Sequence, residues 1–140
     1  MRITLFLTAM AAVQATSVLA QNAPPACDGN ITIVRVSQIK PGGMPAFMAA
    51  VAAHKAWYRA NGVIDNEIVT SRVINRDEKT GAMTYSDTEV ISYHIRPPAQ
   101  DRIPKRGDAA WNAYVKQYRD SSDIKSEYTT CMPKSGANRQ

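Results

Sequence analysis

The stretch Ile31–Lys40, "ITIVRVSQIK", followed by "PGGMP" at residues 41–45, decides the fold. Its many β-branched residues predict a β-strand. Isoleucines fall on one face of this strand and Val34 and Val36 on the other, so both faces are largely apolar. We expect such a strand to be covered on both sides. The Pro-Gly-Gly segment ends the strand, and Pro45 suits the first turn of a helix.

The remaining elements follow from periodicity and turn residues. Asn61-Gly62 predicts the end of the first helix, and Gly81 predicts a hairpin turn. The third strand is long for a flat strand, which makes a bulge plausible. After the first strand, the predicted elements are a helix over Met44–Asn61, strands over Asn66–Arg76 and Ala82–Ile95, a loop over Arg96–Asp108, a helix from Asp108 to about Asp120, and a strand over Ile124–Met132.

The order strand-helix-strand-strand-helix-strand predicts an α+β protein with the ferredoxin-like β-α-β-β-α-β topology. Its sheet is antiparallel, with both helices on one face and the last strand beside the first. We assign residues 31–132 to this single domain. Residues 21–30 form a polar lead, and residues 133–140 are expected to be a disordered tail.

The first twenty residues carry an export signal. Arg2 precedes the apolar run "ITLFLTAMAAV", and "SVLA" at residues 17–20 places small side chains for cleavage. This pattern predicts a signal peptide over residues 1–20 and a periplasmic or secreted protein. The formal charge of +5 is mildly basic. It lacks the dense cationic face of a nucleic-acid binder, and no apolar stretch suits a membrane span.

Cys27 and Cys131 are the only cysteines. In an oxidising compartment their default state is a disulfide. The predicted topology agrees, because the start of the first strand meets the end of the last. The alternative is a pair of metal thiolates, which needs two more ligands, and neither histidine has the usual close spacing to a cysteine. We therefore predict a disulfide and no metal site.

A first strand ending in "IKPGG", an amphipathic helix, a hairpin, a second helix and a short last strand resemble the dimeric α+β barrel superfamily. This resemblance implies a homodimer in which two sheets pack face to face, with helices on the other face. The superfamily includes cofactor-free monooxygenases, isomerases, cyclases and haem-handling proteins. The chain carries no signature of any one branch.

His54 lies at the centre of the apolar stripe of the first predicted helix, with Tyr58 one turn later and Trp57 on the flank. An inward histidine needs a polar partner. One interpretation is a core histidine bonded to a strand. The other is a pocket histidine with an ordinary pKa, acting as an acid or base near neutral pH. Alanines line the opposite side of this helix.

The second predicted helix has an inward aromatic stripe of Trp111, Tyr114 and Tyr118. These rings pack in the core or, together with the rings of the first helix, form the wall of a small-molecule site. The tyrosine hydroxyls also require partners. The four cations of loop 96–108 are consistent with a solvated loop or with attraction of acidic ligands.

Three strand residues complete the candidate site: Arg35, Arg72 and His94. An arginine in a strand covered on both faces pairs with an acid or binds an anionic ligand. For Arg35 we expect a salt bridge to Asp87 or Glu89 on the third strand. The face of His94 is left open because a bulge would reverse it.

These residues predict an exported pocket protein, without a cofactor, that performs acid–base chemistry on a small aromatic or phenolic compound. The reaction would be a lyase, isomerase or cyclase step, with His54 as the base and Tyr58 and Arg35 orienting the substrate. The binding residues would be Trp57, Arg72, His94, Trp111, Tyr114 and Tyr118. Two alternatives stay open: a non-catalytic module that binds a ligand or haem, and a protein whose pocket is filled by its own side chains.

Overall fold

The computed structural model describes residues 26–99, 102–103 and 106–134. Each predicted element is present and lies within two residues of its expected bounds. In chain order the elements are β1 (Asn30–Ile39), α1 (Met44–Ala60), β2 (Glu67–Arg76), β3 (Met83–Ile95), α2 (Ala109–Ser121) and β4 (Ser122–Met132).

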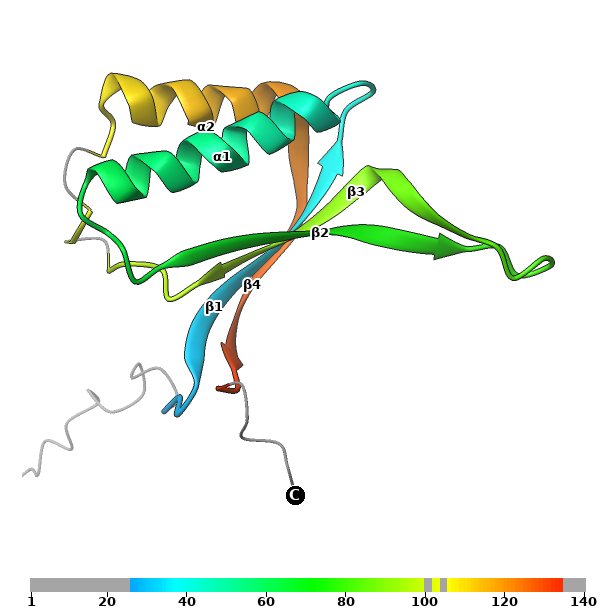
Figure 1. Cartoon of the computed structure of the whole chain (residues 1–140), viewed down its shortest axis with the longest axis horizontal. Coiled ribbons are helices and arrows are strands. Elements are labelled where there is room, and N and C mark those ends of the chain that lie inside the picture. Colours follow the sequence, from blue (N-terminus) through cyan, green and yellow to red (C-terminus); the bar gives the residue numbers. More distant parts are fainter. Residues whose placement is uncertain (1–25, 100–101, 104–105, 135–140) are drawn as a thin grey trace, which may run out of the picture.

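The four strands form one sheet in the order β2-β3-β1-β4, and every neighbouring pair is antiparallel. Both helices lie side by side over one face of this strongly twisted sheet (Figure 1). The predicted ferredoxin-like α+β fold is therefore confirmed. Because β1 lies in the interior of the sheet, its side chains contribute both to the face under the helices and to the opposite face.

Local chemistry sets the helix ends. Pro45 lies in the first turn of α1, and Gly62 follows its end with a φ of +77°, which only glycine adopts without strain. Asp108 caps α2, because its carboxylate accepts a hydrogen bond from the backbone N–H of Trp111 at 2.7 Å. The last strand begins at Ser122, directly after α2 and two residues earlier than predicted.

Two irregularities interrupt the strand pairing. Between Arg72 and Ile74 of β2 the partner on β3 jumps from Val90 to Tyr85, so β3 contains the bulge that its length predicted. A second shift occurs opposite Val36 and Ser37 of β1, where β4 carries an extra residue. These shifts determine which side chains meet across the sheet.

The two faces of the sheet differ in composition. On β1, the side chains of Ile33, Arg35 and Ser37 point toward the helices. Because strand side chains alternate, Val34 and Val36 point to the face that no helix covers. Val34 is nevertheless buried, and its register partners are Tyr93 of β3 and Tyr128 of β4. Val34 and these two rings therefore form an apolar strip in the middle of the uncovered face.

The helices pack on each other through small residues. Ala53, Ala56 and Ala60 of α1 face Ala110 and Ala113 of α2 across a shallow groove. The alanine side of the first helix thus allows the close approach of a second element. The buried apolar core beneath both helices consists of Ile39, Phe47, Val51, Trp57, Tyr58, Val63, Ile68, Val90 and Tyr114.

The predicted disulfide between Cys27 and Cys131 is confirmed, and it links residues 104 positions apart. It lies next to the register pair Ile31 and Cys131, where β1 and β4 meet. The predicted signal peptide, residues 21–25 and most of the tail lie outside the described residues. In the part of the chain that the structure describes, no helix combines the length and apolar character of a membrane span.

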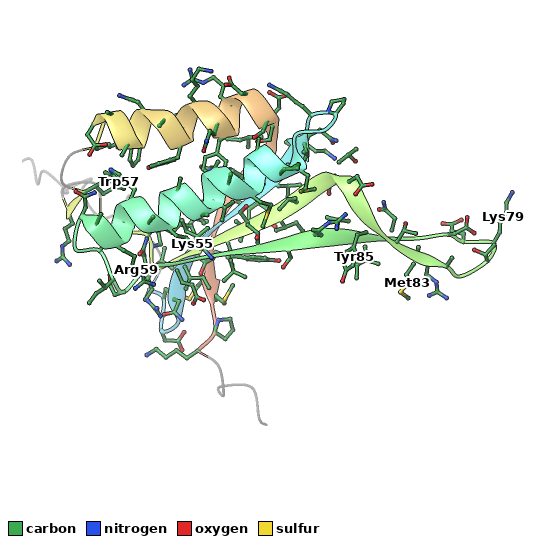
Figure 2. The ribbon with its side chains drawn as sticks, turned by 45° about the horizontal axis from the view of Figure 1, so that its top comes forward. Lys55, Trp57, Arg59, Lys79, Met83 and Tyr85 are labelled. Carbon is green, nitrogen blue, oxygen red and sulfur yellow. A yellow bond between two sulfur atoms is a disulfide. The ribbon has the colours of Figure 1, made fainter. Side chains whose placement is uncertain are left out.

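The far half of the β2–β3 hairpin projects beyond the helices (Figures 1 and 2). Its turn has Gly81 at a φ of +73°, as the sequence predicts, and the backbone N–H groups of Lys79 and Thr80 donate to Asp77. Met83 and Tyr85 on this segment are 66% and 61% exposed. This half of the hairpin contributes nothing to the core.

Candidate functional site

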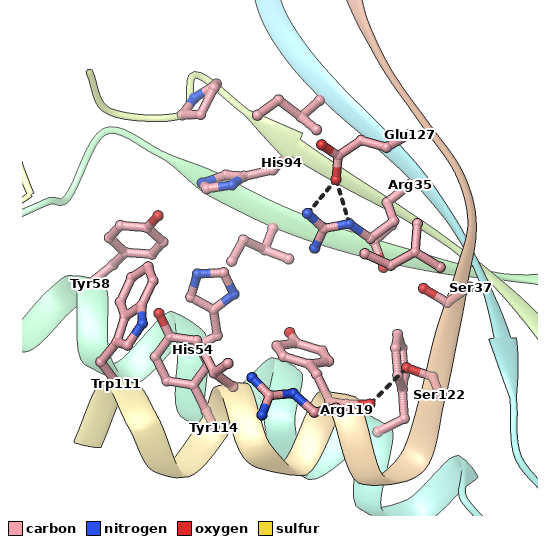
Figure 3. Close-up of a pocket in the computed structure, with 18 of the residues that line it drawn as sticks. Arg35, Ser37, His54, Tyr58, His94, Trp111, Tyr114, Arg119, Ser122 and Glu127 are labelled. Carbon is pink, nitrogen blue, oxygen red and sulfur yellow. Dashed lines mark hydrogen bonds and ion pairs between the residues drawn. The ribbon is translucent and has the colours of Figure 1, made fainter. Parts of the chain in front are cut away.

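A cavity of about 680 Å³ lies between the two helices and the sheet. Its volume is within the usual range for small-molecule sites. Seven of the nine predicted site residues line it: Arg35, His54, Tyr58, His94, Trp111, Tyr114 and Tyr118. Figure 3 shows the helix residues on one side and Arg35 and His94 on the sheet side.

His54 is the centre of an aromatic cluster. Its imidazole stacks on the rings of Tyr114 and Tyr58, with centroid distances of 4.5 Å and 4.8 Å. The rings of His94 and Tyr118 meet its edge at 5.7 Å and 6.0 Å. The prediction that His54 faces inward is confirmed, and the ring is held by stacking on both of its faces.

Two polar atoms in this cluster are buried without a hydrogen-bond partner among the described residues: His54 Nε2 and Tyr114 Oη. The hydrogen bond to a strand, expected for a core histidine, is therefore not observed. A buried polar atom without a partner costs about 1–3 kcal/mol. Native proteins usually satisfy such atoms with ordered water or a ligand.

Both histidines are neutral at physiological pH. Burial, reinforced by the neighbouring His94 and by the positive charge of Arg35, lowers the pKa of His54 to about 3. Burial and then Arg35 lower the pKa of His94 to about 4. The expectation of an ordinary pKa for His54 was wrong, because stacked rings remove the water that would stabilise an imidazolium ion.

The tyrosines remain protonated for the same reason. Burial raises the pKa of Tyr58, Tyr114 and Tyr118 above the usual value of 10. At neutral pH these side chains can donate a hydrogen bond from O–H. The cavity therefore combines neutral imidazoles with hydroxyl groups.

His94 lies on the helix side of β3, which settles the face that the sequence left open. Its Nε2 is 3.2 Å from the side-chain nitrogen of Asn66, just before β2. Because Asn66 can only donate from that nitrogen, His94 Nε2 accepts, and its remaining proton is on Nδ1. This bond fixes the ring in one tautomer.

Arg35 forms an ion pair with Glu127 of β4. The expected partners Asp87 and Glu89 were wrong: Asp87 pairs with Arg72, and Glu89 with Lys125. The reason is the register of the sheet. Glu127 lies directly opposite Arg35 on β4, whereas the opposite residue on β3 is Ser92.

Trp57 does not line the cavity. Its indole N–H donates to Asp108 at 3.1 Å, and its ring is buried between the helices against Trp111, with centroids 4.8 Å apart. The carboxylate of Asp108 therefore both accepts a hydrogen bond from α1, through Trp57, and caps the start of α2. Trp57 thus helps to hold the two helices together above the cavity.

Arg72 lies outside the cavity as well. It pairs with Asp87 at 2.8 Å and stacks over the ring of Tyr85 at 4.8 Å. These partners belong to the projecting half of the hairpin. The side chain is 41% exposed, similar to the 40% of Arg35.

Sequence reasoning missed Asn66 and Glu127. The sequence pattern makes Asn66 the first residue of the second strand, and only the pairing of β2 with β3 brings it to His94. Glu127 is the register partner of Arg35, and the pairing that brings it there runs without a shift from Ile31 and Cys131. The loop residues Ile103 and Arg106 also line the cavity, with Arg106 stacked over Trp111 at 5.3 Å.

The histidines do not fit the axial ligation of haem through Nε2. A haem ligand must present an imidazole nitrogen to open space. Nε2 of His54 is buried, and Nε2 of His94 is engaged by Asn66. Among the described residues, no three metal-binding side chains come together.

No family model and no curated protein matches the sequence. One structure with a similar arrangement is SnoaB, a cofactor-independent oxygenase from Streptomyces nogalater. It is 10% identical with a TM-score of 0.46, over 78% of this chain and 98% of that one. A phage SAM lyase in complex with S-methyl-5'-thioadenosine is 12% identical with a TM-score of 0.34, over 74% and 91% of the two chains. Similarities of this size carry no argument about ligand or reaction.

Proposed function

We propose that the protein is an exported homodimer of the dimeric α+β barrel type whose cavity binds a small aromatic or phenolic compound. The observation that carries this proposal is the ring cluster around His54, with two buried polar atoms that lack partners. A planar ligand can pack against the rings that line the cavity, and its oxygen can meet the two polar atoms when these rings part around it. Each of these atoms needs an ordered water or a ligand group as its partner.

The same cavity supports acid–base chemistry on the bound compound. His54 is neutral, so its imidazole can accept a proton from an acidic C–H or O–H group of the ligand. The electron pair stays on the ligand as an enolate or phenolate. Tyr58 then donates a hydrogen bond to the developing oxyanion, and Arg35 stabilises its charge.

The low pKa of His54 limits this chemistry to a short-lived step. The imidazolium ion persists only while the anion lies beside it, so the proton returns quickly to the ligand. Return to a different carbon completes an isomerisation, and loss of a leaving group completes a lyase reaction. Neither route requires a cofactor.

Two features support export. The disulfide is typical of oxidising compartments, and residues 1–20 have the pattern of a signal peptide.

The apolar face of the sheet, with Val36 and Tyr93 half-buried and Tyr128 exposed, offers a surface for a second copy. Light scattering of the mature protein at micromolar concentration should give the mass of a dimer, and a monomer alone would contradict this part.

Binding and catalysis can be tested without knowing the substrate. 1-Naphthol, a planar phenol, should raise the melting temperature and shift the NMR resonances of the His54 ring. In deuterated water, 1-tetralone should exchange the hydrogens next to its carbonyl faster in the presence of the protein than in its absence. The first result tests binding, and the second tests proton abstraction.

The variant that separates the two is His54→Gln, which keeps hydrogen-bonding capacity but cannot take a proton near neutral pH. We expect it to bind 1-naphthol and to lose about 10²- to 10⁴-fold in exchange rate. Tyr85→Phe, on the projecting hairpin, is the matched control and should behave as wild type. Binding without exchange in the wild-type protein would reduce the proposal to a non-catalytic ligand-binding module.

A further inference from the structure

The charges around the cavity are unequal. Among the described residues that line it, three are arginines, Arg35, Arg106 and Arg119, and one is a carboxylate, Glu127. The two histidines are neutral and the tyrosines protonated, so they add no charge at physiological pH. The wall therefore carries a net positive charge, which favours an anionic ligand.

Arg35 is not fully satisfied by its partner. Both Nε, at 2.7 Å, and Nη2 donate to the same oxygen of Glu127, Oε2. A paired fork would use both carboxylate oxygens. Among the described residues, Nη1 of Arg35 has no hydrogen-bond partner. One edge of the guanidinium group is thus available to a second acceptor.

The ion pair is also accessible. The side chains of Arg35 and Glu127 are 40% and 44% exposed, and an ion pair at that exposure exchanges readily with other anions. Figure 3 shows the pair on the sheet side of the cavity, facing the ring cluster. Arg35 also lowers the pKa of both His54 and His94, which indicates that its charge acts across the cavity.

We infer that the ligand of this cavity is a small aromatic carboxylate, whose carboxylate group binds Arg35 in place of Glu127 while its ring joins the stack around His54. Glu127 is then an internal counter-ion that occupies the guanidinium group until the ligand arrives. This inference rests on the proposed function, because it assigns the chemical class of the compound bound there.

The test compares two probes of nearly the same shape and different charge, 1-naphthoate and 1-naphthamide, by calorimetry at pH 7. The wild-type protein should bind the acid at least about 10-fold more tightly than the amide, since a charge-assisted bond to arginine is lost in the amide. Arg35→Gln should abolish this preference while retaining binding of the amide. Glu127→Gln should strengthen binding of the acid, because the competing carboxylate is removed.

Arg72→Gln is the matched control. Arg72 has the same exposure and a comparable ion pair on the same sheet, outside the cavity, so its loss should leave the preference for the acid unchanged. The Glu127→Gln variant keeps the inference testable if Arg35→Gln fails to fold, since it retains the arginine.

The outcomes separate the two proposals. Equal affinity of the wild-type protein for the two probes would overturn carboxylate recognition and leave the aromatic cavity in place. Weaker binding of the acid after Glu127→Gln would overturn the counter-ion role. Failure of both probes and of 1-naphthol to bind at millimolar concentration would overturn the proposed function as well.

Discussion

The two faces of the sheet are built in opposite ways. Beneath the helices, where a two-layer fold usually has its apolar core, β1 presents Arg35 and Ser37. On the face without helices the same strand presents Val34 and Val36. Beside the apolar core that the helices cover, the same side of the sheet lines a partly polar cavity, whereas the open side of β1 presents apolar side chains at its centre.

The third strand repeats the contrast. Its helix side carries Ser92 and His94 next to the buried Val90, and its open side Ile91 and Tyr93, which are half-buried. A monomer gains little from such an apolar open face, whereas a dimer would bury it. In our proposal, the difference between the faces corresponds to two roles for the sheet: ligand chemistry on one side and association on the other.

We expect the largest effect from removing the disulfide, because this change lowers the stability of the whole domain and does not distinguish the two faces. Replacing Cys27 and Cys131 with serine removes the link between β1 and β4, which closes a loop of 104 residues. The free energy of unfolding should fall by about 4–5 kcal/mol in the chain-entropy model. Chemical denaturation of the double variant under non-reducing conditions measures this loss. A change below about 1 kcal/mol would show that the disulfide does not restrain the unfolded chain.

A charge on the open face should separate the two roles. Val36→Asp places a carboxylate on the proposed dimer surface, and we expect the dimer dissociation constant to rise at least about 100-fold, or roughly 3 kcal/mol. Light scattering across a dilution series measures it. Ala52→Asp, at an exposed position of α1, is the control and should remain dimeric. A dimer that survives Val36→Asp would assign association to another surface.

The helix-covered face should be the pH-sensitive one, because both histidines of the chain lie there. Their pKa values in the folded protein, about 3 for His54 and about 4 for His94, are below the usual 6.5. Between those values and 6.5 the unfolded chain binds more protons than the folded one, so stability falls as the pH falls. Each histidine contributes a slope of up to about 1.4 kcal/mol per pH unit.

Urea denaturation from pH 6.5 to 4.5 measures that slope. The exposed carboxylates Asp77 and Asp120 titrate with pKa values below 3.8, outside this window. His54→Gln should flatten the dependence, and Val36→Thr on the open face should leave it as in the wild type. An unchanged slope in His54→Gln would mean that the imidazole is hydrated and charged in the folded protein.

The sequence predicts the features that short-range chemistry sets. Element bounds follow from Pro45, Gly62, Gly81 and Asp108, which act within one turn of the chain. The inward position of His54 follows from helical periodicity alone. The disulfide could be predicted because topology brings the two ends of the domain together.

What could not be predicted depends on register and on packing between elements. The partner of Arg35 required the residue-by-residue pairing of β1 with β4, which no local signal in either strand fixes. The place of Trp57 required knowing that α2 covers the flank of α1 and brings Asp108 to its indole. The low pKa of His54 arises from burial by rings that other elements supply, such as Tyr114 of α2 and His94 of β3. A helical wheel of α1 alone does not show these rings.

The disulfide has a further consequence for proteolysis. Lys79 lies at the tip of the projecting hairpin, the part of the domain farthest from the helices (Figure 2). A trypsin-like protease that cuts after Lys79 divides the domain into two fragments, one with Cys27 and the other with Cys131. The bond between these cysteines keeps the fragments joined, and the cavity between the helices and the sheet draws on both. A nicked molecule of this kind migrates as one species until a reductant is added, so cleavage in an oxidising compartment would not by itself separate the site.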